Sequence, residues 1–355
     1  MELVSPSVTR VDITSDQDIP LNIVLMKKIE RCGRIAYRSE DKITDDSYIR
    51  FIKGIVKRGH YSVLEHSRIT LDIKRSFFTK TDFEVLSDSL QSFPFLIHSA
   101  VDDKESWYSI TGNFRAFLEW LSAPLPYWYV FRYMKQFLAE MFPPIFEDLI
   151  KEDTPLEPKD GMLRFSEDTQ YRTYHVVTDR GVMAEWTRHR YNMSFTVEST
   201  RYCNYNKKGV TFCLPIPFSW SPTEDDNDEQ FLYNFLKKVG CVEEKGDVSL
   251  ICMNGVSFKG VSELMATFHT MRLWVQHMEA CERVYNEMIE RKLSPQEARS
   301  VLPQSLKSEF CVTGTMGAWE HFLGLRTASD AHPQIRYLAN MIQSDLKLWE
   351  SKTNE

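Results

Sequence analysis

The sequence predicts a mixed α and β (α+β) fold with short strands, and two patterns support this prediction. Residues 68–74 (RITLDIK) alternate apolar and polar side chains with the period of a half-buried strand, whereas residues 261–292 repeat apolar side chains at helical spacing. The 355-residue chain has no regular βαβ alternation, and it contains neither a G-x-G-x-x-G nor a G-x-x-x-x-G-K-[ST] motif. Phosphate binding through a glycine-rich loop is therefore not expected.

The composition is that of an acidic globular protein. The chain is 43% hydrophobic and 13% aromatic with a formal net charge of -7, so we expect no general binding to nucleic acid or to an anionic membrane. No stretch approaches the roughly 18 uninterrupted apolar residues of a membrane span, and the first residues lack the pattern of a secretory signal. Seven scattered cysteines without a C-x-x-C pair favour neither a disulfide framework nor a metal site, and a cytoplasmic location is expected.

A helix, a loop and a strand are predicted in the first part of the chain. The helix covers residues 47–57, where apolar residues recur at helical spacing: Ile49, Ile52, Ile55 and Val56. The loop RGHYSVLEHS breaks this pattern at Gly59 and leads into the strand over residues 68–74.

Residues 76–165 or so differ from their surroundings because they are rich in aromatic residues and carry two helical patterns. One pattern begins after Asn113, a favourable N-cap residue, and the other covers residues 128–142. We expect a single domain over residues 1–355 that carries residues 76–165 as an aromatic-rich helical insertion.

The remaining elements follow from local patterns. Residues 171–179 predict a strand, and Asp179 is expected to cap a short helix over 180–190, with Arg188 and Arg190 at its end. The acidic stretch 221–230 is expected to be a surface loop. Residues 261–292 predict a long buried helix, whose stripe of apolar residues belongs to the core or a subunit interface: Trp274, Met278, Cys281, Tyr285 and Met288.

A further apolar helix is predicted over residues 318–326 (AWEHFLGLR), because Trp319, Phe322 and Leu323 share one face. Arg326 then lies at its C-terminal end. An arginine at this position either compensates the helix dipole or meets an electron-rich ring that must be ionised. The spacing alone does not decide between the two.

One stretch concentrates anion-binding residues. In TRHRYNMSFTVESTRY (187–202), Arg188, Arg190 and Arg201 offer planar donors for phosphate or carboxylate oxygens, and several hydroxyl side chains lie between them. The pattern suits a phosphorylated small molecule. A surface edge of ordinary ion pairs is the alternative that composition leaves open.

A second stretch, GHYSVLEH, contains two histidines and a carboxylate. His60 and His66 are six residues apart, so they do not share the helix face that the H-E-x-x-H zinc motif requires. A hydrogen-bonded histidine that packs the loop is therefore favoured over a metal ligand.

The chain resembles the flavin-dependent thymidylate synthase family. The family signature is R-H-R, a short spacer and S-x-R, which reads here as Arg188-His189-Arg190 and Ser199-Thr200-Arg201. Further blocks agree in order: AYRSEDKIT with GHYSVLEHS, DRGVMAEWTRHR, ARSVLPQSLKSEF and FLGLRTASDAHPQIRYLA. The segments 76–165 and 221–260 are weakly covered by the resemblance.

The resemblance implies a central, mostly antiparallel sheet with long helices and active sites between subunits. It implies reductive methylation of dUMP to dTMP, with 5,10-methylenetetrahydrofolate as carbon donor, FAD as cofactor and NADPH as reductant. The protein is expected to supply binding and electrostatics. A homotetramer is the implied assembly, and the implied partners are small molecules.

The resemblance also implies roles for individual residues. Arg326 would stabilise the ionised pyrimidine and is the expected catalytic residue, and His60 would line the cofactor channel. The expected FAD contacts are Ser62, Arg188, His189, Arg190, Val197, Thr315, Gly317 and His321. The expected dUMP contacts are Glu185, Arg188, Val197, Glu198, Ser199, Thr200, Arg201, Arg299 and Arg326.

Three features depart from the family pattern. The spacer between Arg190 and Ser199 has one residue more than usual, so we expect a bulge at Tyr191–Met193. Val197 stands where a polar Glu or Gln is common. Thr315 and Gly317 stand where the family often has Asn and Arg, and the missing arginine would weaken one FAD contact. These departures leave open an alternative, a flavin- or nucleotide-binding protein that has lost methyl transfer. No cysteine follows a proline, so the cysteine nucleophile of the other class of thymidylate synthase is not expected.

Overall fold

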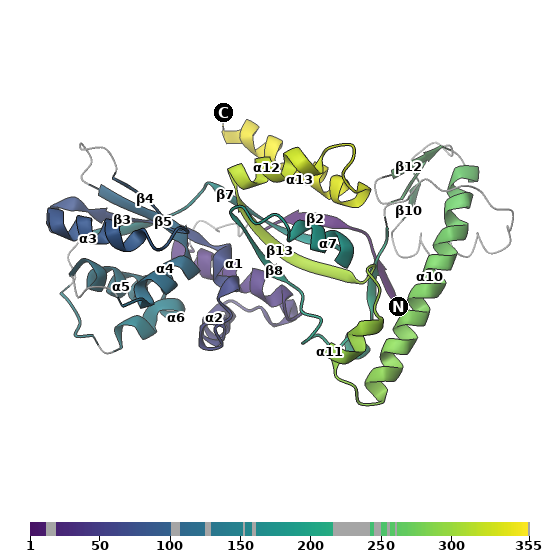
Figure 1. Cartoon of the computed structure of the whole chain (residues 1–355), viewed down its shortest axis with the longest axis horizontal. Coiled ribbons are helices and arrows are strands. Elements are labelled where there is room, and N and C mark those ends of the chain that lie inside the picture. Colours follow the sequence, from purple (N-terminus) through teal and green to yellow (C-terminus); the bar gives the residue numbers. More distant parts are fainter. Residues whose placement is uncertain are drawn as a thin grey trace.

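The computed structural model describes residues 1–11, 19–100, 107–124, 129–151, 153–157, 161–215, 242–244, 250–253, 256–259 and 261–353. The described elements form an elongated molecule, with a helical body around one sheet at one end, a central sheet, and a long helix at the other end (Figure 1). The acidic stretch 221–230 lies outside the described residues.

The central sheet is antiparallel, as the family resemblance implies. Its strand order is β2–β7–β13–β8, from β2 (Ser7–Arg10), β7 (Tyr171–Asp179), β13 (Lys307–Thr315) and β8 (Met193–Val197). β13 pairs along its whole length with β7, from Lys307 opposite Asp179 to Thr315 opposite Tyr171. The prediction of a strand over residues 171–179 is confirmed to the residue.

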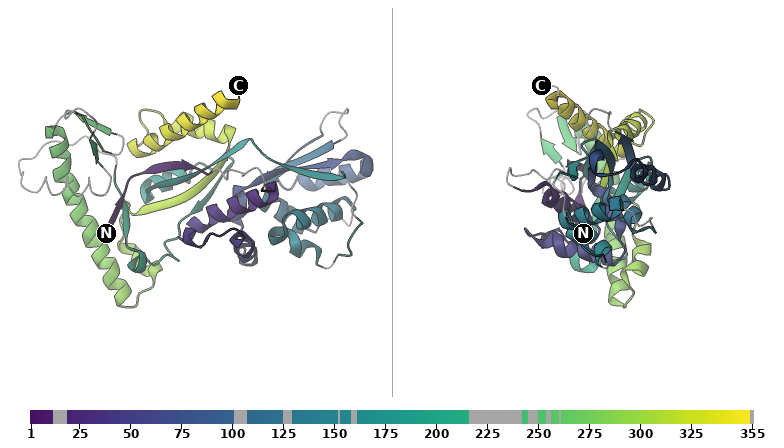
Figure 2. Two further views of the ribbon diagram at one scale, coloured as in Figure 1. Left: turned by 180° about the vertical axis from the view of Figure 1, so that it is seen from behind. Right: turned by 90° about the vertical axis from the view of Figure 1, so that its left-hand side faces the viewer.

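One face of the central sheet is apolar. Phe310 and Val312 of β13 pack with Tyr174 of β7 against α7 (Arg180–Trp186), α12 (Met316–Arg326) and α13 (Pro333–Thr353). The helices α12 and α13 lie above this face in both lateral views (Figures 1 and 2). Trp186 and Trp319 are fully buried here, and their rings meet edge to face. Burial of these large rings stabilises the packing of α7 and α12 on the sheet.

The opposite face of the central sheet is polar, because side chains alternate between the two faces of a strand. It is covered by α1 (Leu21–Ile35) and by the 3-10 helix η2 (Tyr61–His66). His66, which is fully buried, donates or accepts hydrogen bonds at both ring nitrogens, to Thr313 Oγ1 at 2.7 Å and to Thr196 Oγ1 at 2.8 Å. The preference for a structural, hydrogen-bonded histidine in this loop is confirmed for His66.

A second antiparallel sheet lies within the helical body. Its order is β4–β5–β3–β6, from β4 (Ile97–Ala100), β5 (Trp107–Asn113), β3 (Arg68–Lys74) and β6 (Leu163–Glu167). Strand β3 alternates half-buried and buried residues as predicted, and it pairs with β5 and β6 on its two sides. Much of the segment 76–165 therefore shares a sheet and a core with β3. The expected division of the chain into a domain and an insertion stays a prediction.

Five further helices share one apolar core with this second sheet. They are α2 (Ser47–Lys57), α3 (Lys80–Leu90), α4 (Phe114–Ser122), α5 (Tyr129–Met141) and α6 (Pro143–Phe146). The predicted bounds of α2 are confirmed, although Ile49 is exposed and Phe51 takes the buried position. Asn113 caps α4 as predicted, because its Oδ1 accepts a hydrogen bond from the Ala116 amide at 2.8 Å.

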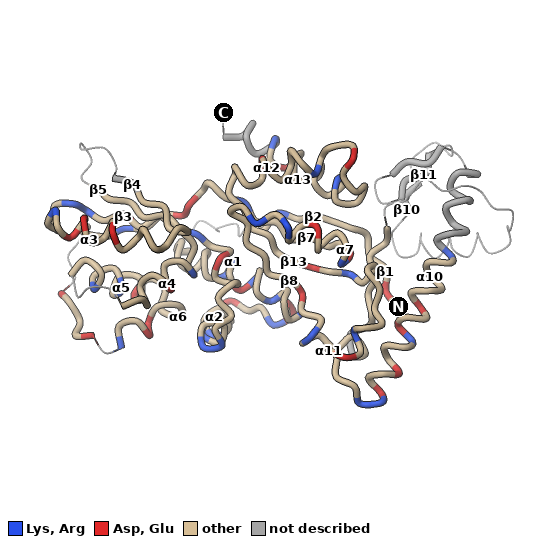
Figure 3. Tube along the Cα trace, in the orientation of Figure 1, with Lys and Arg blue, Asp and Glu red and all other residues tan. Residues whose placement is uncertain are grey.

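The other end of the molecule is built on α10 (Val261–Glu290). The helix is confirmed, but the expectation that it is buried is too broad. Met278 and Tyr285 are buried, whereas Leu273 and Val284 are exposed, and charged residues of both signs follow its other faces (Figure 3). A single apolar stripe suffices because α10 packs on one small cluster that includes Phe212.

Short elements complete this end of the molecule. β1 (Glu2–Val4) pairs in parallel with β9 (Thr211–Cys213), and a separate meander joins β10 (Val242–Glu244), β11 (Leu250–Met253) and β12 (Val256–Lys259). Two short helices, α8 (Tyr205–Lys208) and α11 (Pro295–Ala298), lie beside α10. The remaining 3-10 turns are η1 (Glu40–Lys42), η3 (Arg75–Phe77), η4 (Glu147–Ile150) and η5 (Arg299–Val301).

Two general expectations can be compared with the described residues. None of the helices in the described part of the chain is both long enough and apolar enough to cross a membrane. Five cysteines whose side chains the structure describes form no disulfide, and four of them are buried.

Candidate functional site

Arg326 is the centre of a polar cluster that also contains Glu185 and His189. Its Nη1 donates to Glu185 Oε2 at 2.8 Å and its Nε donates to His189 Nε2 at 2.8 Å. Glu185 comes from the end of α7, His189 from the turn after it, and Arg326 from the last residue of α12. The apolar packing of α7 and α12 therefore brings the three side chains together. We call these three residues the Arg326 cluster.

The electrostatics of the Arg326 cluster keep His189 neutral. Burial, followed by the positive charge of Arg326, lowers the pKa of His189 to about 4. Because Nε2 accepts the hydrogen bond from Arg326, the ring proton lies on Nδ1. The ring rests edge to face on Phe322, at 4.9 Å between ring centroids. A guanidinium held by one carboxylate and one neutral imidazole is thereby fixed in orientation.

The residues 199–201 form a turn after strand β8. The Ser199 amide donates to the Ala36 carbonyl at 3.0 Å, and Ser199 Oγ accepts from the Arg201 amide at 3.3 Å. Thr200 is buried, and its hydroxyl accepts a hydrogen bond from Arg299 Nη1 at 2.8 Å. Arg299 and Arg201 are both exposed. The turn therefore presents two guanidinium groups from distant parts of the sequence on one surface.

Glu198 turns its side chain into the protein. It lies on the polar face of the central sheet and is almost completely buried, with Lys307 Nζ at 3.1 Å and the Tyr205 hydroxyl donating at 2.8 Å. Lys307 also pairs with Glu309, which in turn pairs with His175 at 2.8 Å. These partners lower the pKa of Glu309 to about 2 against the opposing effect of burial. Glu198 can therefore contact a ligand on the outer surface only through its backbone atoms.

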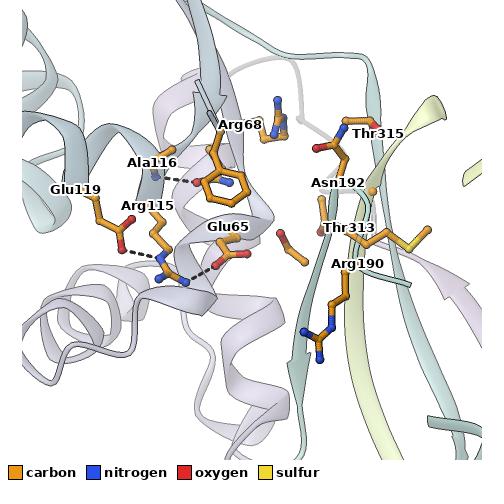
Figure 4. Close-up of a pocket in the computed structure, with 14 residues that line it drawn as sticks. Glu65, Arg68, Arg115, Ala116, Glu119, Arg190, Asn192, Thr313 and Thr315 are labelled. Carbon is orange, nitrogen blue, oxygen red and sulfur yellow. Dashed lines mark hydrogen bonds and ion pairs between the residues drawn. The ribbon is translucent and has the colours of Figure 1, made fainter. Parts of the chain in front are cut away.

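A cavity of about 200 Å³ lies between the central sheet and the helical body (Figure 4). We call it the Arg190 cavity. One wall comes from strands β8 and β13 and the turn before β8, and the other comes from η2, β3, α4 and the turn before β4. The lining residues are Glu65, Arg68, Phe95, Asn113, Arg115, Ala116, Glu119, Arg190, Asn192, Met193, Ser194, Thr313, Gly314 and Thr315. Two of the predicted FAD contacts, Arg190 and Thr315, are among them.

His60 lines a different depression in the surface. Its Nδ1 is hydrogen-bonded to the Tyr37 hydroxyl at 2.7 Å, and Tyr37 in turn meets the ring of Tyr202. Arg34, Lys42 and Arg58 contribute positive charge to the same depression. Tyr202 directly follows Arg201, so this surface continues from the 199–201 turn.

The remaining predicted residues lie at the margins of these groups. His321 is exposed on α12, with its ring centroid 6.4 Å from that of His189. Thr315 caps α12 by accepting from the Ala318 amide, and Gly317 faces open space, so a side chain there would meet nothing. Ser62 and Arg188 are exposed, and Val197 belongs to β8, where it pairs with Phe310.

The extra residue between Arg190 and Ser199 is accommodated before β8 begins. Tyr191 and Asn192 form a turn, Tyr191 is 65% exposed, and Asn192 has a φ of 45°. Asparagine tolerates this left-handed conformation better than most residues. The added residue therefore leaves the pairing of β8 with β13 intact, with Thr196 opposite Cys311.

The two halves of the R-H-R and S-x-R signature lie at opposite ends of β8. Strand β8 spans Met193–Val197, with Arg190 before it and Ser199 after it. At about 3.3 Å per residue, the strand alone separates the two halves by about 13 Å. Within one chain the structure thus brings Glu185, His189 and Arg326 together, and Thr200 with Arg299, but it does not join the two groups.

Sequence reasoning missed several residues of these groups. Arg115, Glu119, Lys307 and Tyr205 lie in segments where no local pattern distinguishes a site residue from a surface residue. One signal was available. Residues 195–198 alternate, so Thr196 and Glu198 share the face opposite Phe195, and the inward direction of Glu198 follows from the strand period.

The chain is similar to several known proteins. The flavin-dependent thymidylate synthase of Aquifex aeolicus is 22% identical over 331 residues, covering 89% of this chain and 92% of that protein. The enzyme of the same name from Corynebacterium diphtheriae is 44% identical over 54 residues, covering 15% of this chain and only 21% of the relative. A crystal structure of the UMP/dUMP methylase PolB from Streptomyces cacaoi aligns at 16% sequence identity, covering 98% of this chain and 92% of its own, with a TM-score of 0.37.

The family model described as thymidylate synthase complementing protein matches residues 161–349, slightly more than half of the 355 residues. The matched region contains β7, β8 and β13 together with all three residues of the Arg326 cluster. The chain belongs to the thymidylate synthase complementing protein family.

Proposed function

We propose that the protein is a flavin-dependent thymidylate synthase that methylates dUMP reductively. The balanced reaction converts dUMP, 5,10-methylenetetrahydrofolate, NADPH and a proton into dTMP, tetrahydrofolate and NADP⁺. The observation that carries the proposal is the Arg326 cluster, in which a guanidinium is held by Glu185 and a neutral His189. Membership of the family and the names of the curated relatives support the same reaction.

Arg326 is the proposed catalytic residue because its charge and orientation suit an ionised pyrimidine. Three of its five N–H groups are used, one by the His189 ring and two by the carboxylate and the backbone carbonyl of Glu185, so two are left for carbonyl and ring nitrogen atoms of a uracil. A positive charge fixed before the reaction stabilises negative charge that develops on the ring. Glu185 balances the charge of Arg326 and stands beside it as a further acceptor for the base.

The 199–201 turn is the proposed binding site for the nucleotide phosphate. Arg201 and Arg299 are exposed guanidinium groups, and Thr200 fixes Arg299 through a hydrogen bond at 2.8 Å. Guanidinium groups bind phosphate oxygens through paired donors. The backbone of residues 197–200 is proposed to add amide donors, and the buried Glu198 anchors this backbone from inside.

FAD is the proposed cofactor, and the groups around Arg190 suit it. Arg190 is exposed, and it lines the same cavity as Ser194, Asn192 and Thr315. Bound flavin would supply the hydride chemistry, with NADPH as the source of electrons. The chain's own residues would bind and orient the ring: Arg188 and His189 directly precede Arg190, and the ring of His321 lies near that of His189.

The separation of the two halves of the signature supports an active site shared between subunits. The Arg326 cluster and the 199–201 turn are held apart by β8, and the exposed Arg201 and Arg299 have room for a partner. We propose that a second copy of the chain completes each site in a homotetramer, and that Ser62 on the exposed side of η2 reaches the flavin of a neighbour.

The test is a reconstitution with purified protein. Protein saturated with FAD and supplied with dUMP, methylenetetrahydrofolate and NADPH is expected to form dTMP, measured by chromatography, in parallel with NADPH oxidation. Absence of dTMP under these conditions would contradict the proposed reaction. Tight dUMP and FAD binding without turnover, with any reductant, would support the alternative of a binding protein that has lost methyl transfer.

A further inference from the structure

The Arg190 cavity has a wall that the family resemblance does not account for. Arg115, Glu119 and Phe95 belong to the segment 76–165, whereas Arg190 and Thr315 on the opposite wall belong to the region that the family model matches. The cavity therefore joins the proposed flavin site to residues of a segment with no assigned role. The inference drawn from it depends on the proposed function.

Arg115 is held firmly at this wall. Its Nη1 donates to Glu65 Oε1 at 2.7 Å and its Nε donates to Glu119 Oε1 at 2.8 Å, as the dashed lines in Figure 4 show. Hydrogen bonds to these two carboxylates raise the pKa of Arg115 against a smaller effect of burial. With these two groups engaged, the Nη2 end of the guanidinium retains its donors for another partner.

The charges of the cavity favour a ligand that has one largely uncharged part and one anionic group beside it. Among the lining residues, three arginines and two glutamates give a formal charge of +1, and Arg68 is neutralised by Asp168 at 2.7 Å. Arg115 shares its charge with Glu65 and Glu119. Among the described residues Arg190 forms no ion pair, so its positive charge is available to bind a phosphate group.

The other lining groups suit a sugar and a base. Hydroxyl and amide side chains surround the cavity: Asn113, Asn192, Ser194, Thr313 and Thr315. Phe95 is 67% exposed at the rim, which leaves the face of its ring accessible. An exposed aromatic ring stacks on a nucleobase, and carboxylates accept hydrogen bonds from ribose hydroxyls.

We propose that Arg115 and Phe95 bind the adenosine half of FAD in the Arg190 cavity. Arg115 donates through its free Nη2 group to the ribose or the adenine, Phe95 stacks on the adenine, and Arg190 holds the phosphate between the two halves of the cofactor. The segment 76–165 thus contributes a cofactor-binding wall, which compensates for the open position at Gly317.

The test compares FAD with FMN, which lacks the adenosine half. The variants are Arg115→Gln and Phe95→Ala, and the matched control is Arg164→Gln, an exposed arginine in the same body that pairs with Asp72 outside the cavity. Affinities are measured by flavin fluorescence titration without substrates. Wild-type protein is expected to prefer FAD over FMN.

Arg115→Gln is expected to weaken FAD binding by about 10- to 100-fold, the range for loss of a hydrogen bond to a charged group, with FMN binding unchanged. Phe95→Ala is expected to weaken FAD binding by about tenfold, again without an effect on FMN. Arg164→Gln should leave both affinities unchanged. Because Phe95 is exposed, its variant is expected to fold even if Arg115→Gln does not.

Two results would overturn the inference. One is equal affinity of wild-type protein for FAD and FMN, and the other is a loss of FAD and FMN affinity by the same factor in both cavity variants. The proposed function fails separately, if wild-type protein binds no flavin or forms no dTMP. If wild-type protein forms dTMP and both cavity variants bind FAD normally, only the proposed role of Arg115 and Phe95 is contradicted.

Discussion

Nε of Arg326 donates a hydrogen bond to Nε2 of His189 over 2.8 Å, although the two residues are 137 positions apart in the sequence. The bond exists only while His189 is neutral, since a protonated ring has no acceptor. A pKa lowered to about 4 keeps the ring neutral at physiological pH. Arg326 is therefore held in one orientation between His189 and Glu185.

Arg326→Ala is expected to reduce turnover by at least about 100-fold, because removal of one fixed electrostatic donor at a developing charge costs that much. The absorbance spectrum of bound FAD should remain largely unchanged. Arg336→Ala, which removes a half-buried arginine of α13 that donates to the Ser329 carbonyl, serves as the matched control and should retain full activity. Full dTMP formation by Arg326→Ala would remove Arg326 from the catalytic site.

Arg201→Ala and Arg299→Ala are expected to weaken dUMP binding by about 10- to 100-fold, since each removes a charged hydrogen bond to the phosphate. Binding of deoxyuridine, which has no phosphate, should not change. Calorimetric titration with both ligands measures the difference, and Arg291→Ala, at the exposed position directly after α10, is the control. Equal losses for dUMP and deoxyuridine would show that these arginines do not bind the phosphate.

Lys307→Met is expected to destabilise the protein by about 3–5 kcal/mol, because the buried Glu198 then loses its nearest cation and Glu309 keeps only His175. The double variant Lys307→Met/Glu198→Leu should recover part of this loss, since it also removes one of the two carboxylates. Urea unfolding of the single and double variants gives the coupling energy. Additive effects would mean that Glu198 and Lys307 do not interact.

His66 is expected to make stability depend on pH. Complete burial, helped by the charge of Lys28, lowers the pKa of His66 from 6.5 to about 3. Between these values the unfolded chain binds a proton that the folded protein does not bind. The stabilisation is therefore complete above pH 6.5 and is lost as pH falls towards 3, by about 1.4 kcal/mol per pH unit.

The variant His66→Asn tests this dependence. At pH 7.5 it should be less stable by about 2–4 kcal/mol, since the hydroxyls of Thr196 and Thr313 lose buried partners. Its free energy of unfolding should fall less steeply than that of the wild type between pH 6.5 and 5. His277→Asn, at an exposed position of α10, should keep the wild-type slope. An identical slope in His66→Asn would contradict the lowered pKa.

Most of the secondary structure follows from local patterns in the sequence. The bounds of β3, β7 and α2 and the caps at Asn113 and Asp179 were predictable, because side-chain period and capping depend on neighbouring residues. Two predictions were wrong because burial and the end of a helix also depend on packing with residues that are far away in the sequence. α10 leaves Leu273 and Val284 exposed, and α7 ends at Trp186, which leaves Arg188 and Arg190 beyond the helix.

The sequence by itself determined the family signature, the antiparallel strands and the residue types of the site. Only the tertiary structure decided which of these residues meet. His66 contacts Thr313 across 247 positions, and Arg299 contacts Thr200 across 99. The two halves of the signature, nine positions apart, lie at opposite ends of β8 instead. The physical reason is that a strand extends its neighbours away from each other, whereas packing of helices and strands on a shared core joins residues that are far apart in the chain.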